Sequence, residues 1–429
     1  MALILFLIYY CGCRSIMAFK SYLALAGCFV LCAAQPIQQN LPVLKEQPLE
    51  VLFKDSAPGL LECITEGGEK NIKYSWQKDG KPFSLSSDVI QRKGEGSLEF
   101  RKPKATDEGK YQCFAETEHG IATSRAISFR RAYLKPVPKP KVQEHKAVEG
   151  RPFKLDCSAP EGYPKPVVSW KTQEDGSDKQ EPYLNRRITP SPDGTLWFSN
   201  VTQEDANPKS KYICVAKSPA FEEEVVLAEH YIKDLEKDSK QNNGDLIPQY
   251  LSNDIIAKAT DVTMIWCIYG GTPLAHPDWF KDGKDVNGKP SDRITRHNRT
   301  SGRRLLIKHT ILEDSGSYKC VANNEKGAPQ EHTIKVTVVS APFFALKPEQ
   351  RVIRKSGEDV YIACKFIGEP APKVTYTYNG KPLTTNERIS TNDDGITIKN
   401  VQKTDNGYYG CRAVNDHGDQ YAESLVFVN

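Results

Sequence analysis

The 429-residue chain lacks the residue patterns by which enzyme active sites are usually recognised. Its eight histidines are scattered, and no two have the His-x-x-x-His spacing of a helical metal site. A Gly-x-Ser-x-Gly nucleophile turn and a glycine loop that holds phosphates are missing too. We therefore expect no enzymatic activity, no cofactor and no metal site.

An excess of charge of one sign is also missing. The 58 Lys and Arg side chains nearly balance the 54 Asp and Glu side chains, and the formal net charge is +4. The overall charge therefore predicts no nucleic-acid partner, although a local basic cluster is still able to bind an anion.

No apolar run reaches the ~20 residues that a membrane-spanning helix needs. Near the N-terminus, Met17 to Lys20 form a positively charged start, residues 22–31 an apolar core, and residues 32–34 a cleavage site of small residues. Residues 1–34 are therefore predicted to be a signal peptide, and the rest of the chain to be soluble and secreted. The first sixteen residues form a second apolar run, which fits either a little-used start at Met1 or a longer signal.

The chain does contain a pattern of Asp, Gly, Tyr and Cys that recurs. It appears at residues 107–113, 314–320 and 405–411, with a looser copy that ends in Tyr212-Ile213-Cys214. A Tyr two residues before a strand Cys is the tyrosine corner of an immunoglobulin-like sandwich, where the Tyr hydroxyl bonds back to the preceding loop. Each copy therefore marks the start of the sixth strand of a sandwich.

Each corner has an upstream partner cysteine and a core aromatic residue between the two. The predicted disulfides are Cys63–Cys113, Cys157–Cys214, Cys267–Cys320 and Cys364–Cys411, and the aromatic residues are Trp76, Trp170, Trp279 and, as a departure, Tyr376. The other four cysteines all precede residue 35. Paired cysteines indicate an oxidising compartment, and each cross-link is worth about 4 kcal/mol in the chain-entropy model.

These repeats predict an all-β protein of four tandem immunoglobulin-like sandwiches. The expected domains are residues 35–134, 135–232, 245–339 and 340–429. Residues 233–244 are polar and charged without apolar periodicity, so we expect a flexible linker there, long enough for the chain to reverse direction. The other junctions, the first of them rich in proline, are short and are expected to be stiff.

Two N-x-Ser/Thr sequons, at Asn200 and Asn298, are candidate glycosylation sites of a secreted chain. An unusual basic cluster in the third domain is the candidate site for a phosphate, sulfate or anionic glycolipid, because arginine matches such groups bidentately. Its members are Arg293, Arg296, Arg299, Arg303, Arg304 and Lys308. The alternative is a solvated basic face, and a glycan on Asn298 would shield part of it.

The period of two along a strand also predicts a contact between domains two and three. If Ile265, Cys267, Leu305 and Ile307 face the core of domain three, then Met264, Trp266 and Leu306 face outward. Trp197 of domain two faces outward by the same rule. We expect these four side chains to pack together through the sheets that hold the second and fifth strands.

Four intermediate-type immunoglobulin domains resemble the N-terminal parts of neuroglian and contactin. The similarity is clear in Cys-Val-Ala-Asn-Asn-Glu-Lys-Gly at residues 320–327 and Cys-Arg-Ala-Val-Asn-Asp-His-Gly at residues 411–418. Those adhesion molecules continue into fibronectin repeats and a membrane anchor. With four domains and a predicted secretion signal, the chain is more similar to the hemolins, a family of immune proteins of insect haemolymph.

The resemblance implies a horseshoe bent at the linker between domains two and three, with domain one against four and two against three. It further implies binding to bacterial lipopolysaccharide and lipoteichoic acid, attachment to haemocytes, and homophilic contacts. A purely homophilic adhesion ectodomain is the alternative. An intracellular structural protein of the muscle type is opposed by the predicted leader and disulfides.

The disulfide pattern is directly testable. We expect non-reducing peptide mapping to recover only the four pairs named above, each within one domain. A cross-link between two domains would contradict the domain assignment.

Overall fold

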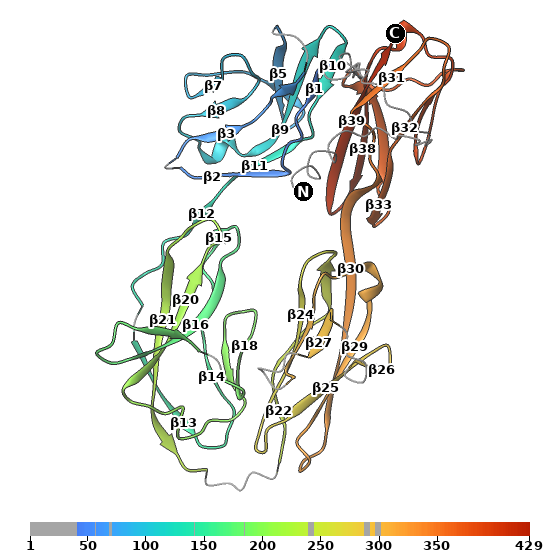
Figure 1. Ribbon diagram of the computed structural model, residues 1–429. Coiled ribbons are helices and arrows are strands. Elements are labelled where there is room, and N and C mark those ends of the chain that lie inside the picture. Colours follow the sequence, from blue (N-terminus) through green and yellow to red (C-terminus); the bar gives the residue numbers. More distant parts are fainter. Residues whose placement is uncertain are drawn as a thin grey trace, which may run out of the picture. The chain divides into compact units, whose positions relative to one another are not determined.

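The computed structural model describes residues 41–55, 57–67, 71–140, 142–183, 185–238, 244–286, 292–296 and 302–429. The expected signal peptide, residues 239–243 of the expected linker, Asn298 and Arg299 lie outside these ranges. Within them, no helix is long and apolar enough to cross a membrane. The described chain is built of strands and short 3-10 turns, which confirms the all-β prediction of four immunoglobulin-like sandwiches (Figure 1).

Each sandwich is built from strands in which apolar and polar residues alternate. In domain one, Leu98 and Phe100 are fully buried and Glu99 between them is partly exposed, so one strand face meets the core. Three sheets result, with strand orders β1-β4, β2-β11-β9-β5-β6 and β3-β8-β7, and β10 pairs with β9. The elements are β1 (Val43–Leu44), β2 (Glu50–Phe53), β3 (Gly59–Leu61), β4 (Thr65–Glu66), β5 (Lys73–Lys78), β6 (Lys81–Phe83), β7 (Val89–Gln91), β8 (Leu98–Phe100), η1 (Ala105–Asp107), β9 (Gly109–Thr117), β10 (Gly120–Thr123) and β11 (Ile127–Arg131).

Domain two repeats this plan with sheets β13-β21-β20-β16-β17 and β14-β19-β18, and β12 pairs with β15. Its elements are β12 (Tyr133–Leu134), β13 (Val142–Val148), β14 (Phe153–Leu155), β15 (Gly162–Tyr163), β16 (Val167–Glu174), β17 (Gln180–Pro182), β18 (Ile188–Pro190), β19 (Leu196–Phe198), β20 (Ser210–Lys217) and β21 (Glu224–Glu236). Strand β21 continues to Glu236 in parallel pairing with β13, so the first four residues of the expected linker are strand rather than coil.

Domain three has sheets β22-β24-β28-β27 and β23-β30-β29-β25-β26, and domain four has β31-β39-β38-β34-β35 and β32-β37-β36. The elements of domain three are β22 (Ile247–Leu251), β23 (Ile255–Lys258), β24 (Thr263–Gly270), β25 (His276–Lys281), β26 (Lys284–Asp285), β27 (Ile294–Arg296), β28 (Arg304–Ile307), η3 (Leu312–Asp314), β29 (Gly316–Asn323) and β30 (Gln330–Leu346). Those of domain four are β31 (Arg351–Arg354), β32 (Val360–Ala363), β33 (Lys365–Glu369), β34 (Lys373–Tyr378), β35 (Lys381–Pro382), β36 (Ile389–Asn392), β37 (Gly395–Ile398), η4 (Lys403–Asp405), β38 (Gly407–Asn415) and β39 (Gly418–Val428). Strand β30 belongs to both domains, because it ends by pairing with β33 (Figure 1).

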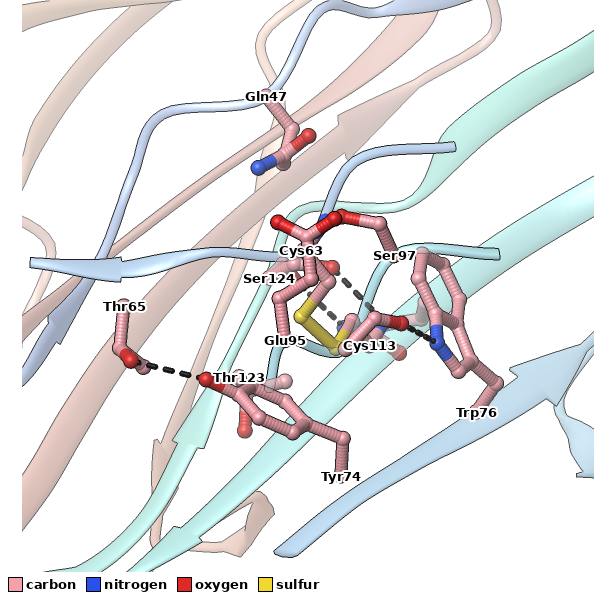
Figure 2. Close-up of a disulfide and its surroundings, with 12 residues drawn as sticks. Gln47, Cys63, Thr65, Tyr74, Trp76, Glu95, Ser97, Cys113, Thr123 and Ser124 are labelled. Carbon is pink, nitrogen blue, oxygen red and sulfur yellow. Dashed lines mark hydrogen bonds between the residues drawn. A yellow bond between two sulfur atoms is a disulfide. The ribbon is translucent and has the colours of Figure 1, made fainter. Parts of the chain in front are cut away.

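A disulfide and an aromatic side chain lie at the centre of each sandwich, at the four cysteine pairs expected from the sequence. Figure 2 shows the Cys63–Cys113 bond with Trp76 beside it. The indole N–H of Trp76 donates to the carbonyl of Gly96 (2.7 Å), and Trp170 and Trp279 make the same kind of bond in domains two and three. This bond satisfies the one polar atom that each buried indole carries.

Domain four keeps this arrangement although it has Tyr376 in place of Trp. The Tyr376 hydroxyl donates to the carbonyl of Asn392 (2.6 Å), so a different donor reaches the turn before the fifth strand. Domain four therefore departs from the others in the size of its core ring but not in the way the ring is held.

All four tyrosine corners are formed. The corner hydroxyls donate to the carbonyl of the preceding Asp at 2.8 to 3.2 Å, in the pairs Tyr111–Asp107, Tyr212–Asp205, Tyr318–Asp314 and Tyr409–Asp405. The longer loop of domain two, which lacks the Gly of the other copies, makes the same bond. The looser sequence pattern thus produces the expected geometry.

Two histidines form an unusual pair inside domain two. His230 on β21 is buried, and its Nδ1 lies 2.9 Å from Nε2 of His145 on β13. Burial lowers the pKa of His230 to about 4, a net shift to which the neighbouring His145 ring adds and which Asp156 opposes. Burial also lowers the pKa of His145.

This pair predicts that domain two loses stability in acid. The folded pKa of His230, about 4, lies below its ordinary 6.5, so the unfolded chain binds the proton more readily. The contribution of neutral His230 to the free energy of unfolding is therefore complete above pH 6.5 and is lost as the pH falls to about 4. This contribution is on the order of 3 kcal/mol at most. In urea unfolding across this range, we expect His230→Asn to flatten the pH slope of the free energy of unfolding and the exposed His417→Gln to leave it unchanged. Equal slopes in all three proteins would contradict the assignment.

Candidate functional site

Domains two and three meet through the sheets that hold their second and fifth strands. The Gln249 side-chain amide of β22 donates to the carbonyls of Phe198 (2.9 Å) and Phe153 (3.3 Å) in domain two. The Gly271 amide donates to the carbonyl of Ser199 (2.8 Å). Most acceptors at this contact are thus backbone carbonyls of domain two.

A glycine allows this close approach. A Cβ added to Gly270 would lie 2.5 Å from Cγ of Pro152 and 2.8 Å from the carbonyl oxygen of Ser199, both in domain two. The first of these atoms belongs to a proline ring and the second to the backbone, so neither moves aside easily.

The outward side chains predicted for this contact are placed differently from one another. Trp266 reaches across, and its indole N–H donates to the carbonyl of Pro190 in domain two (3.2 Å). The indole N–H of Trp197 donates to Oγ of Ser191 within its own domain (2.8 Å). Met264 and Leu306 are partly buried, on paired strands of domain three.

The basic cluster is not a continuous exposed patch. Arg303 is fully buried at the contact, where its guanidinium donates to the carbonyl of Arg186 in domain two (2.6 Å). Burial lowers the pKa of Arg303 to about 10, and the charge of Arg187 adds to the effect. Arg304 is partly buried, and burial lowers its pKa as well. The interpretation of Arg303 as a surface anion ligand is therefore corrected, because the side chain joins two domains.

Arg293 has a structural partner. It binds the corner residue Asp314 with two nitrogens, at 2.8 and 2.9 Å. Arg187 and Arg388 bind the corner aspartates of domains two and four in the same way, so this pair is part of the fold in three domains.

The remaining members of the cluster lie nearer the surface. Arg296 is partly exposed and pairs with the exposed Asp278 (3.1 Å), Lys308 is exposed, and Arg299 lies outside the described residues. The structure therefore does not bring the five described side chains of the cluster together as one anion site.

Asn200 lies at the contact between domains two and three. Its side chain is 8% exposed, and its Nδ2 donates to Oγ1 of Thr272 in domain three (3.3 Å). A glycan on this nitrogen would occupy the space of domain three, so glycosylation of Asn200 and this contact exclude one another. Asn298 lies outside the described residues.

Domains one and four make a second contact, whose residues the sequence analysis missed. The Tyr408 hydroxyl donates to the carbonyl of Pro42 (2.6 Å), and Asn379 Oδ1 accepts from the Ile121 amide (3.3 Å). Gly120 has φ +132°, and a Cβ there would lie 2.2 Å from Asn379 Oδ1. Tyr408 is the one residue of this contact that the sequence pattern could have indicated. It must point outward, because the adjacent Tyr409 forms the tyrosine corner and points inward.

Charged groups and a small apolar cluster complete this second contact. Arg351 donates to the carbonyls of Leu41 (2.8 Å) and Glu66 (3.1 Å), and Lys347 pairs with Glu46 (2.9 Å). The apolar cluster contains Leu41, Val43, Ala115, Ala122, Tyr408 and Leu425. Across the described residues, no group of three or more His, Cys, Asp or Glu side chains is arranged to hold a metal ion.

The chain matches two family models of the immunoglobulin superfamily. Residues 248–338 and 342–428 match the immunoglobulin I-set domain, and residues 42–117 and 135–218 match an immunoglobulin domain model. Among curated proteins, hemolin of Manduca sexta is 56% identical over 415 residues, which span 96% of this chain and all of the relative. Neuroglian of Drosophila melanogaster is 37% identical over 93% of this chain and 32% of the relative.

Solved structures of immunoglobulin-domain proteins are also similar to this chain. The crystal structure of the insect immune protein hemolin, described as a new domain arrangement with implications for homophilic adhesion, has a TM-score of 0.86 and 53% identity. It covers 90% of this chain and 100% of that chain. The four N-terminal immunoglobulin domains of Dscam1 isoform 9.44 have a TM-score of 0.68 at 20% identity, cover 91% of this chain and all of theirs, and share the fold.

The close approach of domains two and three at Gly270 predicts that adding one methyl group there weakens the contact. We expect Gly270→Ala to weaken the contact while leaving each sandwich folded, because the added Cβ meets domain two and not the core of domain three. Hydrogen exchange at the Gly271 amide, which bonds across the contact, should accelerate at least tenfold after correction for the new neighbour. The exposed Asn253→Ala is the control. Unchanged protection in Gly270→Ala would show that the two domains are not packed this closely.

Proposed function

The chain belongs to the hemolin family of the immunoglobulin superfamily, and we propose that it is a secreted innate-immune recognition protein of the haemolymph. In this proposal it binds bacterial lipopolysaccharide and lipoteichoic acid, attaches to haemocytes, and modulates adhesion partly by homophilic contacts. At a coarser level, the chain is a non-enzymatic protein of the immunoglobulin superfamily, in the class of adhesion and immune proteins. Its match to hemolins over the whole of their length supports the proposed role.

We assign any anion contact in domain three to the side chains that remain at the surface. Lys308 is exposed, and Arg296 pairs with an exposed carboxylate, which a phosphate is able to displace. Arg303 contributes indirectly, because its bond to the Arg186 carbonyl joins domains two and three. Replacing Arg303 would therefore disturb the domain contact before it disturbed ligand binding.

A purely homophilic adhesion protein is the second candidate. It is favoured by the same observation that weakens the first, namely that Arg293 and Arg303 are held in the fold and leave a smaller basic surface. If the protein is purely homophilic, we expect it not to bind lipopolysaccharide at any salt concentration.

Binding to immobilised lipopolysaccharide at low and high salt separates the two. For the first candidate we expect binding that weakens with salt, and a loss of about tenfold at low salt in Arg296→Gln with Lys308→Gln. The control, Lys355→Gln with Lys373→Gln, removes the same charge from exposed positions of domain four and should bind like the wild type. Wild-type protein that self-associates but does not bind lipopolysaccharide at either salt concentration would favour the second candidate.

A further inference from the structure

The carboxyl group of a partly buried glutamate lies at the contact between domains one and four. Glu423 is on β39 of domain four, and both of its carboxyl oxygens lie 2.9 Å from the Thr123 amide nitrogen of domain one. The Tyr421 hydroxyl, on the same face of β39, donates to Oε2 (3.0 Å). The carboxyl therefore joins two domains through the backbone of β10.

Burial of the Glu423 carboxyl outweighs the groups that favour its negative charge. Glu423 and Tyr421 line a cavity of about 70 Å³ at the contact. Burial acts against the ionised form, and the bonds from the Thr123 amide and the Tyr421 hydroxyl act in its favour. A carboxylate held by two neutral donors in a confined space loses more solvation than these bonds return.

We propose that Glu423 makes the contact between domains one and four sensitive to pH: the contact takes up a proton when it closes, and ionisation of the carboxyl favours its opening. The inference concerns the contact alone and holds whichever ligand the protein binds. Opening exposes the β10 backbone of domain one and the outward face of β38 and β39 in domain four.

The sign follows from the two states of the contact. In the closed state, burial raises the pKa of Glu423 from its ordinary 4.5 to about 8, whereas an open contact returns the carboxyl to water. At a pH between these two pKa values, closing of the contact is therefore accompanied by uptake of a proton. The contact is strongest in mild acid and weakens as the pH rises through this window, by up to about tenfold in the opening constant per pH unit.

Other charged and titratable groups surround Glu423 and have to be separated from it. The cavity is also lined by Arg125, Lys45, Glu46, Lys347 and Tyr408. The phenol of Tyr408 is buried and its pKa is raised, so it stays neutral through this range. The His119 ring of domain one lies 5.4 Å from the Phe427 ring of domain four, so this imidazole is at the contact too.

Hydrogen exchange at the Thr123 amide tests the proposal, because the acceptor of this N–H belongs to the other domain. After correction for the intrinsic pH dependence of exchange, the protection factor should fall by up to about tenfold per unit from pH 5 to 8. Glu423→Gln replaces the carboxyl with a neutral amide of the same shape and should remove this dependence. The matched controls, His119→Gln and Glu46→Gln, lie at the same contact and should keep the wild-type slope.

Two outcomes would overturn the proposal: protection in the wild type that does not vary with pH, or a Glu423→Gln variant that keeps the wild-type slope. If Glu423→Gln does not fold, the ¹³C-labelled carboxyl carbon of Glu423 is titrated by NMR in the full wild-type chain. A midpoint well above 4.5 supports the proposal, and a midpoint near 4.5 overturns it.

Discussion

Each sandwich depends on the disulfide that joins its two sheets and on the aromatic ring packed beside it. The disulfide fixes which side chains of the second and sixth strands point inward. Because strand side chains alternate, it also fixes which of them point outward. The tyrosine corner holds the sixth strand to the preceding loop, so the inward and outward sets are kept over the whole strand. The outward set supplies side chains to both domain contacts, among them Trp266 of a second strand and Tyr408 of a sixth strand.

The two domain contacts also use side chains from other strands and from turns, and they do so in different ways. Between domains two and three, Gln249, Trp266 and Arg303 donate to backbone carbonyls, and Gly270 lets the two backbones come close. Between domains one and four, the side chains of Asn379 and Glu423 accept from backbone amides of domain one. Because backbone groups keep their place when side chains change, both contacts depend mainly on the few side chains that reach across.

The fold was predictable from the sequence because its signals are local and repeated. Cysteine pairs, the core aromatic residue and the tyrosine corner lie at characteristic spacings, and even the irregular corner of domain two follows them. The outward placement of Trp266 was predictable for the same reason. The role of Arg303 was not, because charge alone gives no sign that a guanidinium faces a second domain rather than solvent. The contacts of Thr123, Asn379 and Glu423 were not predictable either. No pattern in the neighbouring sequence indicates them, because they form only when two domains far apart in the chain come together.

The two contacts also differ in how their charges respond to pH. Burial lowers the pKa of Arg303 only to about 10, so its guanidinium stays charged throughout the neutral range and the bond to Arg186 is kept. A carboxyl in a similar position behaves differently, because desolvation moves its pKa upward into the neutral range and not away from it. Glu423 is such a group. Domains two and three are therefore joined by a bond that is insensitive to pH, whereas the contact of domains one and four contains the group whose ionisation opposes it.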